Sequence, residues 1–90
     1  MDINKYSPDI RKKLIELMDN RGKNPARVLE LCDALERTGR NLDDDALIGF
    51  ALFSRGETYY LMNDTTNFYT SMLACLTPME RLNDWGYVAM

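Results

Sequence analysis

The sequence predicts an all-α protein. Apolar residues recur at the three- and four-residue intervals of a helix, and four of the apolar segments begin with helix-capping residues. No segment alternates apolar and polar residues for long enough to predict a sheet. The 90 residues, 46% of them hydrophobic, correspond to one small globular domain.

The first two helices are predicted from the same starting chemistry, a capping residue followed by proline. Ser7-Pro8-Asp9 predicts a helix over residues 8–20, which Gly22 ends in a left-handed conformation. Asn24-Pro25 predicts a second helix that ends at Gly39. The connection is short, so the two helices are expected to form an antiparallel hairpin. The residues expected to face the core are Ile10, Leu14, Leu17 and Met18, then Val28, Leu29, Leu31, Cys32 and Leu35.

Three further helices follow in the prediction, about five in all. One residue of the acidic triplet 43–45 is expected to cap a helix over residues 45–62. Asp64 or Thr65 is expected to cap the next helix, which Pro78 ends. The core-facing residues of that helix are expected to be Phe68, Met72, Cys75 and Leu76. Asn83-Asp84 then precede an apolar segment, 85–90, that has no C-terminal cap, and we interpret residues 1–90 as a single N-terminal domain of a larger protein.

Charge and composition exclude several classes of function. Residues 1–40 carry nine Lys/Arg against seven Asp/Glu, whereas residues 41–90 carry two against seven, so the second half is acidic. An acidic surface disfavours phosphate contacts. Histidine is absent, which removes the most common general base and metal ligand. Cys32 and Cys75 are interpreted as buried residues of a cytoplasmic protein. No cofactor, metal or catalytic residue is expected.

Residues 52–64 resemble a tetratricopeptide repeat, in which a first helix carries W-x₂-L-G-x₂-Y and a second carries A-x₃-F before a proline. Gly56 and Tyr59 match the glycine and tyrosine of that pattern, and Pro78 lies close to the expected proline. A glycine inside a helix favours close helix packing, which compensates for its low helix propensity. The sequence departs from the pattern at the remaining positions. Leu52, Arg55, Phe68 and Met72 occupy the tryptophan, leucine, alanine and phenylalanine positions.

The resemblance implies antiparallel helical hairpins stacked as a right-handed array, with Leu52, Gly56, Tyr59, Phe68, Met72 and Cys75 packing the repeat. The chain also resembles divergent helical repeats at the N-termini of bacterial signalling proteins, including diguanylate cyclases. That resemblance implies a non-catalytic interaction or regulatory assembly module, with an output domain outside these residues. The expected partner is a protein, a peptide or a second copy of the chain. The residues expected to contact it are Tyr60, Tyr69, Trp85 and Tyr87, because aromatic residues are enriched at interfaces.

Particular residues suggest three alternative functions. The first two helices could act as a helix-turn-helix on nucleic acid through Lys23 and Arg27, although neighbouring acidic residues dilute this basic face. Arg11-Lys12-Lys13 could place the first helix on a membrane surface, but a core-facing stripe is the favoured interpretation. Glu57 beside two tyrosines could form a site, but a solvated helix glutamate is the favoured interpretation.

Overall fold

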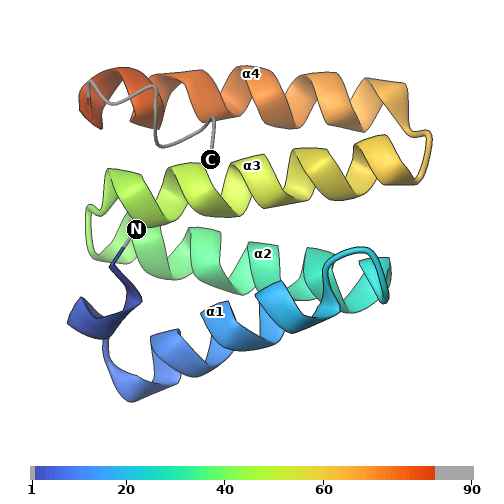
Figure 1. Ribbon diagram of the computed structural model, residues 1–90. Helices are drawn as coiled ribbons and strands as arrows, with labels where there is room; N and C mark the ends of the chain where they lie inside the picture. Colours follow the sequence, from blue (N-terminus) through green and yellow to red (C-terminus); the bar gives the residue numbers. More distant parts are fainter. Residues whose placement is uncertain (1, 83–90) are drawn as a thin grey trace.

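The computed structural model describes residues 2–82, which form an all-α structure (Figure 1). A 3₁₀ turn, η1 (Ile3–Lys5), precedes four α-helices. The helices are α1 (Pro8–Asn20), α2 (Pro25–Asn41), α3 (Asp45–Leu61) and α4 (Thr65–Leu82). Neighbours in the chain pack antiparallel, and α4 lies at the outer edge. No strand occurs in residues 2–82, so the predicted fold class is confirmed. The expected helix over 85–90 lies outside the described residues.

The predicted helix starts agree with the observed hydrogen bonds. Ser7 Oγ accepts a hydrogen bond from the Ile10 N–H at 3.4 Å, and Asn24 Oδ1 accepts one from the Arg27 N–H at 3.3 Å. Asp44 is the member of the acidic triplet that caps α3. These caps occupy amide groups that have no partner inside a helix. Gly22 has a φ of 74°, so the predicted left-handed residue after α1 is confirmed.

The α2–α3 and α3–α4 connections share one backbone conformation, and their corresponding residues are 20 positions apart in the sequence. The middle residues of segments 42–44 and 62–64, Asp43 and Asn63, have φ values of 53° and 60°. In each segment the third N–H donates to the carbonyl oxygen five residues earlier, at 2.8 and 2.9 Å. Asp44 and Asp64 then cap the following helices. Equivalent faces of α3 and α4 are therefore related by the same 20-residue shift.

Gly39 lies inside α2 and does not end it, which corrects the predicted boundary. The helix continues to Asn41, and Asp43 adopts the left-handed conformation expected of a terminating glycine. A Cβ on Gly39 would lie 2.8 Å from Ile48 Cγ1 and 3.0 Å from the Ile48 backbone nitrogen. Glycine is therefore needed here because α3 passes close to α2.

Pro78 also lies inside a helix, so the predicted end of α4 is wrong. Proline removes one backbone hydrogen bond and costs about 3 kcal/mol in a helix interior. Burial beyond the proline offsets this cost. Met79 is fully buried, and Leu82 packs against the apolar cluster between α3 and α4. Tertiary packing therefore extends the helix for one further turn.

Two residues predicted to face the core point outward. Met18 is 41% exposed, because the buried face of α1 is formed by Ile10, Leu14 and Leu17 alone. Leu76 is 42% exposed, because the face of α4 that meets α3 includes Cys75 and its next residue lies about 100° further round the helix. α1 therefore buries a narrower stripe than its apolar pattern predicts, and α4 buries a rotated one.

Within residues 2–82 the buried apolar side chains form two clusters that meet at α3. The larger cluster joins η1, α1, α2 and one side of α3, and the smaller cluster joins the other side of α3 to α4. This arrangement explains why α3 is apolar on more than one face. Both predicted buried cysteines are buried, Cys32 in the larger cluster and Cys75 in the smaller. Burial raises the pKa of the Cys32 thiol to about 12.

The packing between α3 and α4 uses two glycines that each receive a methionine. Ideal Cβ atoms on Gly56 and Gly49 would lie 2.6 and 2.0 Å from the terminal methyl carbons of Met72 and Met79. The glycine pair and the methionine pair are each seven residues apart, so one antiparallel register satisfies both contacts. At Gly56 the space that a Cβ would need is filled by the Met72 side chain. Of the other predicted packing residues, Leu52 and Cys75 are buried, and Tyr59 and Phe68 are half-buried.

Candidate interaction surface

The α1–α2 loop and the α3–α4 turn lie at the same end of the molecule (Figure 1). Exposed apolar residues occur at the C-terminal end of α3, next to this turn. Tyr60, Leu61 and Met62 are consecutive at the C-terminal end of α3, with exposed fractions of 64%, 60% and 48%. Single exposed apolar residues are common, but three in succession form a patch. We call this region the end surface.

A groove with a volume of about 310 Å³ opens on the end surface. Its lining comes from the loop before α2, the first turn of α2 and the last two turns of α3. The lining residues are Gly22, Pro25, Val28, Glu57, Thr58, Leu61 and Met62. Most of this lining is apolar, and the volume lies at the lower end of the range found for ligand-binding pockets.

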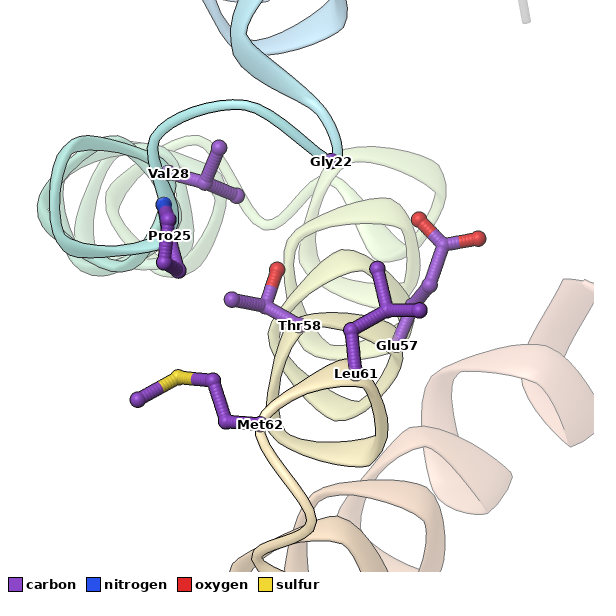
Figure 2. Close-up of a pocket in the computed structure, with 7 residues that line it drawn as sticks. All are labelled: Gly22, Pro25, Val28, Glu57, Thr58, Leu61 and Met62. Carbon is purple, nitrogen blue, oxygen red and sulfur yellow. The ribbon is translucent and has the colours of Figure 1, made fainter.

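Figure 2 shows how the side chains from the two helices face each other. Pro25 and Val28 form one wall, and the side chains of Thr58 and Met62 point toward that wall from α3. The Thr58 hydroxyl donates a hydrogen bond to the Ser54 carbonyl oxygen at 2.8 Å, and its methyl group points toward Pro25. The groove therefore offers a mainly apolar interior.

An ion pair holds one edge of the groove. Arg21, at the C-terminal end of α1, donates to both carboxylate oxygens of Glu57 at 2.9 and 2.6 Å. This two-point geometry is the most directional form of an Arg–carboxylate contact. It connects the end of α1 to α3 across the α1–α2 loop. Glu57 is therefore a half-buried ion-pair partner, and its carboxylate points away from Pro25 and Val28 (Figure 2).

The two described tyrosines predicted to contact a partner are both exposed. Tyr60 is 64% and Tyr69 is 63% exposed, and each packs its ring against Phe68, with centroid distances of 5.5 and 6.1 Å. A shallow cavity of about 150 Å³ beside Tyr60 and Phe68 continues the end surface around the α3–α4 turn. The other two predicted contact residues, Trp85 and Tyr87, lie outside the described residues.

The two candidate nucleic-acid contacts, Arg27 and Lys23, differ in their ion pairing. The Arg27 guanidinium contacts the Glu16 carboxylate on α1 and also Glu30, and its hydrogen bond holds the pKa of Glu16 below its usual value. Within residues 2–82, Lys23 is in no ion pair or side-chain hydrogen bond. Arg27, a candidate nucleic-acid contact on the α1–α2 pair, is therefore largely neutralised by Glu16 and Glu30.

A second ionic cluster, outside the groove, joins α2 to α3. Arg55 contacts Asp33 at 2.6 Å and Glu36 at 2.7 Å, and Arg40 also bonds Glu36. Burial tends to raise the pKa of Glu36, but the hydrogen bonds from the two arginines lower it overall. Arg55 therefore connects α2 and α3 through charge and not through apolar packing.

Sequence reasoning missed the groove itself. Gly22 and Pro25 were recognised as helix-boundary residues, and Val28 as a core residue, but the loop places them opposite the end of α3. The available signal was the pair Leu61 and Met62, two apolar residues directly before a turn. No segment of local sequence shows which loop lies beside such a pair.

Within residues 2–82, no group of three or more His, Cys, Asp or Glu side chains is placed to hold a metal ion. In the same part of the chain, every helix is too short or too polar to cross a membrane. Comparison of the chain with protein-family models, curated proteins and solved structures finds no match. The assignment of function therefore depends on the surface geometry.

Proposed function

We propose that this chain is a non-catalytic interaction module that binds a protein or peptide segment at its end surface. The observation that supports the proposal is the groove of about 310 Å³ beside the exposed Tyr60, Leu61 and Met62. Protein interfaces commonly centre on an apolar anchor residue that fills a pocket, surrounded by a more polar rim. The groove provides such a pocket, and the Arg21–Glu57 pair provides a polar edge.

The chemistry of the lining indicates the kind of segment that fits. Val28 is almost fully buried and forms part of the apolar wall, whereas Leu61 and Met62 are exposed beside it. One or two apolar side chains of an incoming segment would cover both. Methionine is flexible and polarisable, so Met62 can adapt to side chains of different shape. The sequence resemblance extends the proposal to regulation of an output domain in the same protein.

A displayed library of random peptides, selected against the 90-residue protein, tests this function. Selected peptides are then titrated by calorimetry against the wild type, Met62→Glu and Ile15→Glu. Ile15 is 47% exposed on α1 and serves as the matched control. We expect Met62→Glu to weaken binding by about 10-fold or more, because an apolar anchor would then face an unpaired carboxylate.

The control variant should bind as the wild type does. NMR chemical-shift changes on adding a peptide should concentrate on groove residues such as Gly22, Val28 and Thr58. Selection of no peptide, or binding that is equally insensitive to both substitutions, would refute the proposed site.

A further inference from the structure

The outward face of α4 carries an apolar stripe that no other described element covers. Tyr69, Leu73 and Leu76 are 63%, 60% and 42% exposed and follow the four- and three-residue spacing of one helix face. We call these three residues the outer stripe. α4 packs on α3 and is the last helix of the described stack (Figure 1). None of the seven groove residues belongs to this stripe.

The composition of α4 supports burial of this face in a complex. Residues 65–79 contain no Asp, Glu, Lys or Arg, although 28% of the chain is charged. A solvent-facing helix side usually carries charges, and charged residues are depleted at the centres of protein interfaces. More than four turns of α4 therefore have the composition of a helix that is in contact on both sides.

The 20-residue shift between α3 and α4 shows which face the outer stripe is. α3 meets α4 through Gly49, Phe53, Gly56 and Tyr60. A shift of 20 residues places these positions at Tyr69, Leu73, Leu76 and Glu80 of α4. The outer stripe is thus the face of α4 that corresponds to the helix-binding face of α3. Its natural occupant is another antiparallel helix.

We propose that this occupant is α4 of a second copy of the chain, packed antiparallel across a two-fold axis at Leu73. The stripe is self-complementary about that residue, because Tyr69 and Leu76 lie four residues before it and three residues after it. Tyr69 of one copy then packs against Leu76 of the other, and the two Leu73 side chains meet at the axis. Such a contact is isologous and closes as a dimer.

The charges at the ends of α4 agree with this pairing. Glu80 continues the line of the outer stripe and is exposed. In the antiparallel register it lies opposite Thr66 of the second copy, in the first turn of α4. The amide groups at a helix N-terminus favour a nearby carboxylate. The uncharged segment between these ends brings no like charges together, although each chain carries a net charge of −3.

Light scattering and sedimentation of the 90-residue protein over about two orders of magnitude in concentration test the dimer by mass action. The expected mass rises to about 21 kDa, twice the 10.4 kDa of one chain. Leu73→Glu should weaken the dimer by about 100-fold or more, because it places two carboxylates together at the axis. Ile15→Glu makes the same change on α1 and should leave the dimer intact. Circular dichroism should show both variants folded, because both side chains are exposed.

A charge exchange tests the antiparallel register itself. Glu80→Lys should weaken the dimer by placing a cation beside the N-terminus of the other α4. Adding Thr66→Glu should restore it through an ion pair between positions 80 and 66 of different copies. A protein that stays monomeric at every concentration would overturn the proposal, including the case in which residues outside 2–82 cover the stripe. A dimer that Leu73→Glu leaves unchanged would also overturn the proposal. If Thr66→Glu does not restore the dimer weakened by Glu80→Lys, the antiparallel register is overturned. Peptide binding at the groove is measured separately, so either proposal can fail alone.

Discussion

Replacing Gly49 with alanine tests the glycine–methionine packing between α3 and α4. The new Cβ would lie 2.0 Å from the Met79 methyl carbon, where ordinary contact begins near 3.4 Å. Met79 must retreat by about 1.4 Å, but it is only 1% exposed and has no solvent to move into. Overpacking of a core typically costs about 1–3 kcal/mol. The helix propensity of alanine returns about 1 kcal/mol.

We therefore expect Gly49→Ala to lower the free energy of unfolding by about 1 kcal/mol. Gly56→Ala is the matched control, because its Cβ would meet the Met72 methyl carbon at 2.6 Å and Met72 is only half-buried. Met72 can swing toward solvent, so the propensity gain should cancel or exceed the cost. Leucine at position 56 is too large for this adjustment and should destabilise the protein by a few kcal/mol, on the order of the larger overpacking costs.

Urea denaturation of the single variants and of Gly49→Ala/Met79→Ala measures the coupling. Met79→Ala alone should cost about 2–5 kcal/mol through the cavity that it leaves. In the Gly49→Ala background the same change should cost at least 1 kcal/mol less, on the order of typical coupling energies between contacting residues. Additive free energies, or equal effects of alanine at positions 49 and 56, would refute the packing argument.

Three further predictions concern individual residues. Burial raises the pKa of Cys32 from 9.0 to about 12, so the thiol loses its proton at lower pH in the unfolded chain than in the folded protein. The free energy of unfolding should therefore fall as pH rises from 9.0 to about 12. The difference in this free energy between wild type and Cys32→Ala should change by up to about 1.4 kcal/mol per pH unit in that range. The pKa of Glu36 in the folded protein is lowered from 4.5, so its carboxylate stabilises the fold above that pH and this contribution is lost on further acidification. Urea denaturation at a series of pH values should show that the difference in free energy of unfolding between wild type and Glu36→Gln shrinks below pH 4.5. Asn63 has a φ of 60°, a left-handed conformation that glycine adopts more easily than alanine. In thermal unfolding Asn63→Gly should stabilise the protein by about 0.5 kcal/mol, and Asn63→Ala should destabilise it by about 1 kcal/mol. Equal melting temperatures of the two variants would contradict the left-handed conformation.

The helix starts were predictable because their chemistry is local. The side chains of Ser7, Asn24, Asp44 and Asp64 accept hydrogen bonds from amides only three residues ahead. A left-handed Gly22 is equally local, since the absence of a Cβ permits its positive φ without any distant contact. These features need no knowledge of which helices become neighbours.

The helix ends at Gly39 and Pro78 were predicted wrongly because distant residues decide them. Gly39 stays helical as α3 brings Ile48 against it, and the turn after Pro78 stays helical as Met79 and Leu82 pack on α3. The same applies to the candidate sites. Tyr60 and Tyr69 were predicted as contact residues because aromatic residues are enriched at interfaces, but their exposure is seen only in the structure. The groove required Val28 and Met62, 34 positions apart, to meet.

Local hydrogen bonding and conformational preference therefore set where each helix of this protein begins and how the chain turns between helices. Which side of a helix is buried, and which side remains for another molecule, depends on contacts between residues far apart in the chain. Met18 and Leu76 illustrate the difference, since both continue an apolar pattern but remain exposed. How much of an apolar stripe is buried depends on how much of the helix surface the neighbouring helices contact. Only the packed structure determines these contacts.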